Sequence, residues 1–239
     1  MNIAVIFAGG TGQRMNTRTR PKQFLELHGK PIIIHTIEQF ENHPLIDAVV
    51  VVCIEGWIKV LERECRKDFV TKVASIVPGG ATGQESICRG VFEAERLFPA
   101  DSIALIHDGV RPLIDEDTIT RDIACAQEHG NAITVVPATE TVIQGSGGKV
   151  ENVLDRRACM LARAPQCFVL RDIAEAHRRA LADGLGDAFI DSCDLMRHYG
   201  HELYMVEGCS ENIKITTPSD FYVFRAISDA RESSQIFGI

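Results

Sequence analysis

The chain of 239 residues carries a formal net charge of −8, with 45% hydrophobic and 24% charged residues. This length is enough for one large or two small globular domains, either of which can bury a full hydrophobic core. The acidic balance excludes a general nucleic-acid-binding protein because no basic excess covers the surface, although a local basic cluster can still bind phosphate.

Targeting and redox signals are weak along the whole sequence. No stretch approaches the ~18 consecutive apolar residues that a membrane span requires, and the start, Met1-Asn2-Ile3, lacks the charged region of a signal peptide. The eight cysteines are scattered without a C-x-x-C pair, a spacing that fits neither a zinc site nor a small disulfide scaffold. Scattered thiols are typical of a reducing compartment. The sequence therefore predicts a soluble cytoplasmic protein with no membrane and no nucleic-acid partner.

Short apolar runs alternate with longer amphipathic segments up to Pro137. The runs have the length of strands, and the segments between them have helical periodicity. Strands that are apolar on both faces and separated by helices form a parallel sheet covered on both sides. The expected fold class is therefore α/β with a doubly wound, mostly parallel sheet. The predicted strands are 2–8, 46–54, 71–77, 101–107 and 131–138, and the predicted helices are 31–41, 55–68, 84–98 and 115–130.

The alternation stops after Pro137. Residues 139–157 alternate around Gly145-Ser146-Gly147-Gly148 and predict a hairpin that is too polar for the core. Such an arm packs on a neighbouring subunit or forms a surface flap. Helices are then predicted at 171–183 and 192–199, a strand at 201–208, and a last helix after Thr217-Pro218. Since no linker interrupts the chain, we expect a single domain over 1–239 with a β-arm at 139–160 that serves in dimerisation.

The loop after the first strand favours a phosphate-binding site. Gly9, Gly10 and Gly12 allow backbone N–H groups to approach an anion. The Walker motif is absent because no Lys-Ser or Lys-Thr follows, and the dinucleotide motif fails at Met15. Four cations follow the glycines instead: Arg14, Arg18, Arg20 and Lys22. A turn whose charges are merely solvated does not require so many cations within a few residues.

Two later segments carry charges in positions suited to phosphate chemistry. Asp108 follows an apolar strand in "IHDGVRP", so its carboxylate is expected in the crevice beyond the strand ends. A carboxylate beside a polyphosphate needs a hard cation such as Mg²⁺ between them, although Asp108 can equally be a turn former. Arg111 could hold another phosphate. Lys214 lies in the apolar frame "ENIKITTPSD", where lysines are more often solvated than ligand-binding.

These segments together resemble a known family. The successive motifs "AGGTGQRM…RPKQF", "PGG…S", "HDGVRP", "DR" at 155–156, "APQ" at 164–166 and "ENIKIT" are similar to those of the cytidylyltransferases of the methylerythritol-phosphate type. That family includes the 2-C-methyl-D-erythritol 4-phosphate enzyme and the ribitol-5-phosphate enzyme. The match runs in order from Ile3 to about Phe224.

The resemblance implies a Rossmann-like nucleotidyltransferase that joins CTP to a polyol phosphate and releases pyrophosphate. It implies Mg²⁺ or another divalent cation, a homodimer, and direct attack on the α-phosphate without a covalent nucleophile. The implied roles are as follows: catalysis by Arg14, Lys22 and Lys214; metal binding by Asp108; the cytosine and ribose pocket by Ala8, Gly9, Gly10, Thr11, Gly12, Gly80 and Ser86; and polyol-phosphate binding by Arg111, Thr141, Arg156 and Asp191. Thr141 would act across the dimer interface.

Several positions depart from the family pattern. Phe7 precedes residue 8 where the family often has Ala, Ala81 replaces a common aspartate of the cytosine pocket, and Gly83 replaces a frequent arginine. Ala164 and Ile190 replace threonines on the polyol side. A sugar-phosphate nucleotidyltransferase that uses another NTP therefore stays open, as does a non-catalytic nucleotide-binding protein.

The resemblance favours D-ribitol 5-phosphate over 2-C-methyl-D-erythritol 4-phosphate as the acceptor. The spacing from Arg14 to Lys22 resembles the longer loop of the ribitol enzymes, and "HDGVRP" and "IHTIEQF" resemble their corresponding segments. None of these features touches the hydroxyl groups that distinguish the two acceptors.

Overall fold

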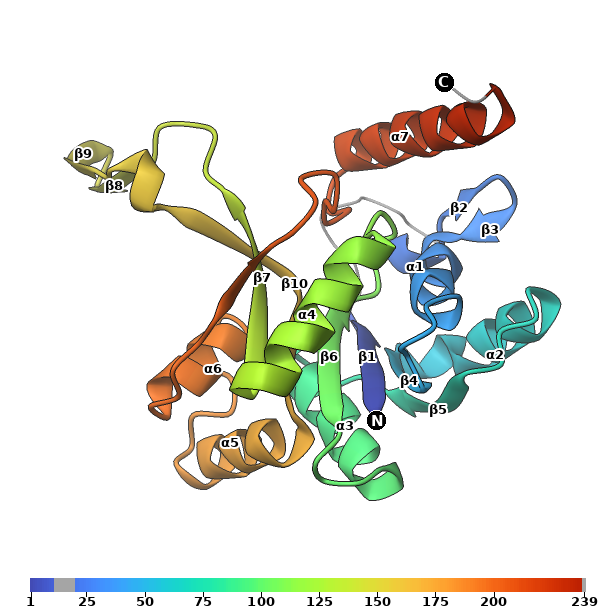
Figure 1. The fold of residues 1–239 in the computed structure, drawn as a ribbon, viewed down its shortest axis with the longest axis horizontal. Helices are drawn as coiled ribbons and strands as arrows, with labels where there is room; N and C mark the ends of the chain where they lie inside the picture. Colours follow the sequence, from blue (N-terminus) through green and yellow to red (C-terminus); the bar gives the residue numbers. More distant parts are fainter. Residues whose placement is uncertain (11–19, 238–239) are drawn as a thin grey trace.

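A seven-stranded sheet organises the chain. The computed structural model describes residues 1–10 and 20–237 (Figure 1). The strand order is β11-β7-β10-β6-β1-β4-β5, and every neighbouring pair is parallel except the two that involve β10. This confirms the predicted mostly parallel α/β sheet. The strands are β1 (Asn2–Ala8), β4 (Ala48–Cys53), β5 (Val73–Pro78), β6 (Ile103–Asp108), β7 (Asn131–Pro137), β10 (Met160–Val169) and β11 (Met205–Glu207).

The central strands are buried on both faces because both kinds of position along them are apolar. In β4, all six residues of "AVVVVC" are buried. Side chains of a strand alternate between the two faces, so Ile6 and Val51 contribute to one hydrophobic cluster while Val5 and Val50 contribute to the other. This two-sided pattern requires a helical layer on each face.

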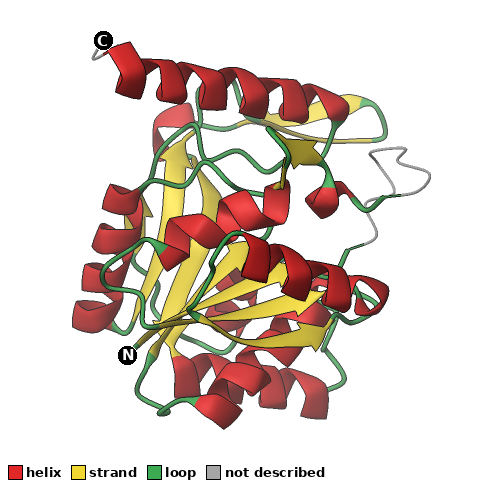
Figure 2. Cartoon of the chain, turned by 90° about the vertical axis from the view of Figure 1, so that its right-hand side faces the viewer, coloured by secondary structure: helices red, strands yellow, loops and turns green. Residues whose placement is uncertain are grey.

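Helices supply those two layers (Figure 2). One face is covered by α1 (Ile32–Glu41), α2 (Ile58–Lys67) and α4 (Glu116–His129), and the other by α3 (Gly83–Leu97), α5 (Leu170–Ala182) and α6 (Ser192–His198). Gly90 lets α3 approach the sheet, since a Cβ there would lie 2.7 Å from methyl groups of Val5 and Val52. The side chains of Thr82, Asp115 and Asp191 cap α3, α4 and α6.

The strand β10 is the main element that the sequence did not predict. It lies antiparallel between β6 and β7, and its register shifts between Ala162 and Gln166. Pro165 at this irregularity disguises the strand, because proline cannot donate a ladder hydrogen bond and signals against a central strand. The predicted strand 201–208 is also shorter than expected, at Met205–Glu207, and a small hairpin of β2 (Glu26–Leu27) and β3 (Lys30–Pro31) was not predicted.

The predicted arm extends away from the sheet in Figure 1. It consists of β8 (Ile143–Ser146) and β9 (Lys149–Val153), an antiparallel pair whose residues are all exposed. At the other side of the molecule, α7 (Pro218–Phe237) begins at the predicted proline and packs Phe224 against the ring of His35, with centroids 5.5 Å apart. Within the described part of the chain, no helix has the length and apolar character needed to cross a bilayer.

Candidate active site

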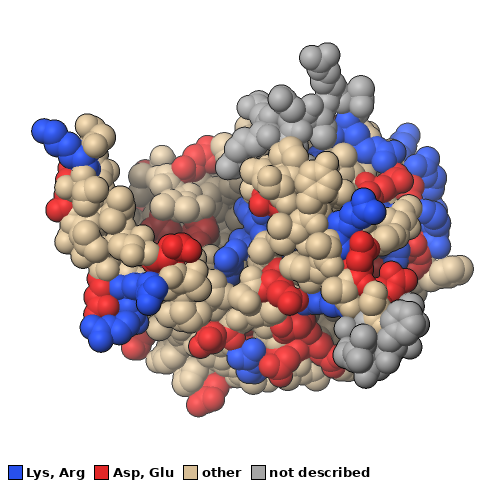
Figure 3. Space-filling view, turned by 90° about the horizontal axis from the view of Figure 1, so that it is seen from above, with Lys and Arg blue, Asp and Glu red and all other residues tan. Residues whose placement is uncertain are grey.

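The carboxyl edge of the sheet forms the site. β1 pairs in parallel with both β4 and β6, and the chain continues outward from β4 to β5. The direction of winding therefore reverses between β1 and β6, the point beyond which open α/β sheets bind their ligands. A cavity of about 260 Å³ lies at this edge, with walls from β6, β10, α3 and the start of α6. Figure 3 looks down on the edge and shows a hollow between the arm and the rest of the molecule, with basic side chains at its border.

Asp108 lies between two cations at the end of β6. Its Oδ2 accepts a hydrogen bond from Nε of Arg111 at 2.8 Å, and its Oδ1 lies 2.6 Å from Nζ of Lys214. Burial alone would raise the pKa of Asp108, but the charges and hydrogen bonds of Lys214 and Arg111 lower it to about 2. The carboxylate is thus ionised at neutral pH, and two positive charges surround one negative charge.

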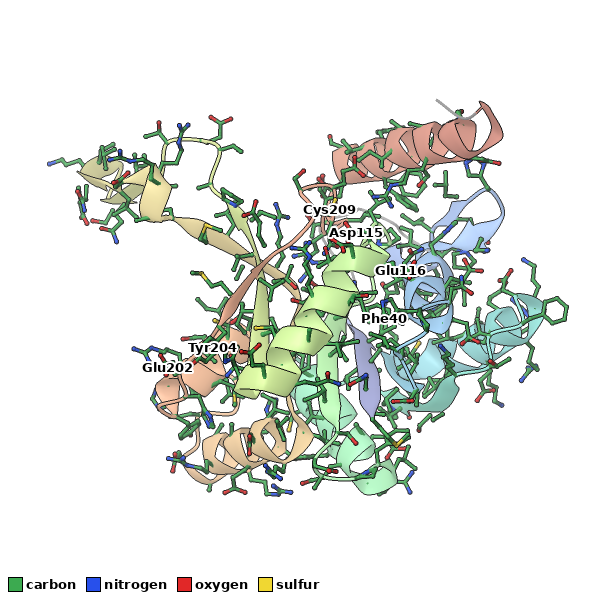
Figure 4. All side chains as sticks on the ribbon, viewed as in Figure 1. Phe40, Asp115, Glu116, Glu202, Tyr204 and Cys209 are labelled. Carbon is green, nitrogen blue, oxygen red and sulfur yellow. The ribbon has the colours of Figure 1, made fainter. Side chains whose placement is uncertain are left out.

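Lys214 reaches this position because the chain after β11 is tied across the sheet. The N–H of Gly208 donates to the carbonyl of Val135. The side chains of Cys209 and Asp115, the N-cap residue of α4, are hydrogen-bonded to each other (Figure 4). Further on, the N–H of Ile215 donates to the carbonyl of Val110 at 2.9 Å. These bonds hold the segment over the end of β6, so the side chain of Lys214 pairs with Asp108 although it is partly exposed.

Lys22 lies beside the same segment. It begins the short 3-10 helix η2 (Lys22–Phe24), and its Nζ donates to the carbonyl of Ile215 at 3.2 Å. The buried side chain of Gln23 fixes this turn to the first loop, because its Nε2 donates to the carbonyls of Ala8 at 2.6 Å and Gly10 at 3.1 Å. Lys22 therefore contacts Ile215, the residue that follows Lys214 in the chain. Arg14, Thr11 and Gly12 lie outside the described residues.

The two glycine-rich loops at which the base pocket is predicted touch each other. A Cβ on Gly9 would lie 2.6 Å from Oγ of Ser86, and a Cβ on Gly79 would lie 2.8 Å from Cα of Gly9. The N–H of Gly80 donates to Oγ of Ser86 at 3.1 Å. Gly9, Gly80 and Ser86 are thus brought together. At the variant position Ala81, the backbone N–H donates to the carboxylate of Glu85 at 2.7 Å.

Asp191 lines the cavity opposite Asp108 and also has a structural role. Its Oδ1 accepts the N–H of Asp194 as the cap of α6, and its Oδ2 accepts Nε2 of Gln166 at 2.8 Å. Gln166 in turn accepts the N–H of Cys193 through Oε1. The carboxylate is therefore held in one orientation at the cavity wall.

Thr141 and Arg156 are not brought to this cavity within one chain. Both lie at the arm, where Arg156 opens the short helix η4 (Arg156–Ala158) and donates to the carbonyl of Thr139 at 2.8 Å. Neither residue lines the cavity. Their action on the site of a neighbouring subunit stays a prediction.

The described residues could hold a divalent cation only together with phosphate groups of the substrate. No group of three potential metal ligands of the His, Cys, Asp or Glu type occurs among residues 1–10 and 20–237. Mg²⁺, however, is usually bound by one or two carboxylates together with substrate phosphates. Asp108 could supply that one carboxylate once the side chain of Lys214, which is 42% exposed, turns its Nζ from Oδ1 toward a phosphate.

Three supporting residues were missed by the sequence reading although they lie inside the quoted motifs. Gln23 follows Lys22 in "RPKQF". Burial lowers the pKa of His107 to about 4, so it is neutral and donates from Nε2 to the carbonyl of Arg111 at 3.1 Å. Asn212 accepts NH1 of Arg111 at its carbonyl and donates to the carbonyl of Ala164. Each of these polar residues has an apolar neighbour on one side and a charged neighbour on the other, and this pattern within a motif is the signal that could have identified them.

The fold, with its cation-bound aspartate at the end of β6, is that of a nucleotidyltransferase. The family model described as 2-C-methyl-D-erythritol 4-phosphate cytidylyltransferase matches residues 2–229. The chain belongs to this family, and it is a CTP-dependent nucleotidyltransferase.

Individual relatives match this chain over all or nearly all of its length. The chain is 52% identical to proteins named ribitol-5-phosphate cytidylyltransferase from Streptococcus agalactiae and Vibrio parahaemolyticus, with 100% of each chain covered. Among solved structures, it is similar to the 2-C-methyl-D-erythritol 4-phosphate cytidylyltransferase of Francisella tularensis. That similarity has a TM-score of 0.77 and 26% identity, and it covers 95% of this chain and 99% of the other.

The ion pairs of Asp108 predict a pH-dependent contribution to stability. Because folding lowers the pKa of this group from 3.8 to about 2, its stabilisation is complete above about pH 4 and is lost as the pH falls toward 2. Asp108→Asn should lower the free energy of unfolding at pH 7 by about 3 kcal/mol, since the buried Arg111 loses its partner. Urea unfolding at pH 7 and at pH 2.5 should show the difference between variant and wild type shrinking at the lower pH.

Asp117→Asn is the matched control. Asp117 pairs with Arg121 on the surface, where an ion pair contributes about 0–1 kcal/mol. An equal difference between Asp108→Asn and wild type at both pH values would contradict the assigned pKa.

Proposed function

We propose that this enzyme transfers CMP from CTP to D-ribitol 5-phosphate, giving CDP-ribitol and pyrophosphate. The observation that carries the proposal is the Asp108 cluster with its two cations at the reversal point of the sheet. The names of the full-length relatives at 52% identity favour ribitol 5-phosphate as the acceptor. The alternatives are 2-C-methyl-D-erythritol 4-phosphate as the acceptor, or a sugar phosphate with another NTP.

In the proposed reaction, a phosphate oxygen of the acceptor attacks the α-phosphorus of CTP, and the bond to pyrophosphate breaks. The described residues that line the cavity include neither histidine nor cysteine, so the site offers no obvious base–nucleophile pair and direct transfer is favoured. Lys214 and Lys22 would lie against the triphosphate and stabilise the charge that develops on it. Arg14 would join them. Mg²⁺ at Asp108 would supply further positive charge to the phosphates when bound.

The nucleotide would lie over the first two glycine-rich loops. Backbone groups from Ala8 to Gly12, together with Gly80 and Ser86, would hold cytosine and ribose. Recognition of the base would depend more on backbone groups than in relatives with an aspartate at position 81. The acceptor would lie on the other side of Asp108, against Arg111 and Asp191.

The proposed enzyme is a homodimer in which Thr141 and Arg156 of the arm complete the acceptor site of the partner. Apolar side chains on the exposed arm support this arrangement: Ile143, Val150 and Val153 are 54–61% exposed. Sedimentation equilibrium should give the mass of two chains. Replacing these three residues together by Ser should shift the mass toward one chain, whereas an unchanged mass would identify the arm as a surface flap.

A pyrophosphate-release assay with each of four NTPs and a panel of acceptors tests the function. We expect release with CTP and ribitol 5-phosphate, and a kcat/KM for methylerythritol 4-phosphate at least about 10-fold lower, as expected when a site built for one set of hydroxyls meets another. No release with CTP and any polyol phosphate would overturn the proposal.

Two lysines test the proposed mechanism. Lys22→Ala and Lys214→Ala should each lower kcat by about 100- to 1,000-fold, because one preorganised charge-stabilising group contributes roughly 3 kcal/mol to the barrier. Lys59→Ala, which removes an exposed lysine of α2, is the control and should leave kcat unchanged. Normal turnover in either active-site variant would remove that lysine from the mechanism.

A further inference from the structure

Arg163 is a cation of the cavity that takes no part in the ion pairs of Asp108. Arg163 lies on β10 at the register shift between Ala162 and Gln166, and it lines the same cavity as Asp108, Arg111 and Lys214. Its Nε is buried and has no hydrogen-bond partner among the described residues. Removing a guanidinium N–H from water without a partner is unfavourable, so this atom has the properties of a donor that awaits a ligand.

The acidic groups of the cavity cannot neutralise Arg163. Asp108 is engaged by Arg111 and Lys214, and Asp191 is engaged by Gln166 and the backbone of Asp194. Residues 11–19, outside the description, contain no aspartate or glutamate. The cavity walls therefore carry an excess of positive charge.

The same surroundings make the charge of Arg163 unfavourable until an anion binds. Burial first, and then the charge of Arg111, lower the pKa of Arg163. An anion placed between the two guanidinium groups would relieve this repulsion. Arginine binds phosphate with several parallel hydrogen bonds, which makes a dianionic phosphate monoester the best complement.

Arg163 lies beside residues of the cavity that offer no polar side chain. Ala164, its neighbour, and Ile190 also line the cavity. Ile190 is 91% exposed and offers no hydrogen bond from its side chain. The donors that these two positions lack are available from the guanidinium of Arg163.

We propose that Arg163 binds the phosphate group of the polyol phosphate acceptor. This inference rests on the proposed function, since it assumes that a polyol phosphate occupies the cavity. CTP also carries phosphates, but the proposed function assigns its triphosphate to Lys22 and Lys214. Arg163 is therefore assigned to the acceptor.

The test compares Arg163→Met, Arg163→Lys and a matched control, Arg197→Met, which removes an arginine from the last turn of α6. The KM values for ribitol 5-phosphate and for CTP are measured, together with the inhibition constant of inorganic phosphate against the acceptor. Arg163→Met should raise the acceptor KM and the phosphate inhibition constant by about 10- to 100-fold, as expected for loss of a charged hydrogen bond. The KM for CTP should change less than about 2-fold, since CTP contacts none of the altered atoms.

Arg163→Lys keeps the charge and should recover part of the acceptor affinity, which a purely structural role would not explain. A similar acceptor KM in Arg163→Met and Arg197→Met would overturn the inference, as would a rise in the CTP KM equal to that for the acceptor. Equal defects in the Lys and Met variants would also overturn it. Those outcomes require an active wild type, so they are distinct from failure of the proposed function, in which the wild type itself uses no polyol phosphate.

Discussion

The ion pairs of Asp108 are the constraint on which the site depends. A buried carboxylate is stable at the end of β6 only because Arg111 and Lys214 neutralise it. Arg111 comes from the turn that directly follows, whereas Lys214 comes from the segment before α7. Asp108 therefore connects the turn after β6 to the segment before α7. The cations of these two segments, Arg111 and Lys214, meet at the end of β6.

The second constraint is steric. The loop after β1 and the loop after β5 touch through Gly9 and Gly79, where any side chain would meet backbone atoms or the Ser86 hydroxyl. The close approach brings peptide groups of both loops together. The proposed base pocket would consist mainly of these backbone groups and would not depend on the side chain at position 81, where the carboxylate of Glu85 accepts the N–H of Ala81.

The sequence predicted the parts of the molecule that follow from simple periodicity. β1, β4, β6 and β7 are apolar on both faces, and α7 begins at a proline, so each had a clear signal. β10 was missed because Arg163, Pro165 and Gln166 interrupt it where the ladder itself is irregular. The function of Asp108 was left open for a related reason, since its partner Lys214 lies far away in the sequence and only the tertiary fold brings the two together.

The two halves of the site differ in how freely they can vary. On the proposed nucleotide side, the ends of β1 and β6 and the glycine contacts position the residues, and a substitution there would disturb the central strands. On the proposed acceptor side, the irregular part of β10 and the capped start of α6 are held by side-chain hydrogen bonds such as that between Gln166 and Asp191. Substitutions there, as at Ala164 and Ile190, alter the cavity wall without disturbing the sheet ladder. Under the proposed division, the acceptor side can change while the nucleotide loops and the sheet ladder stay the same.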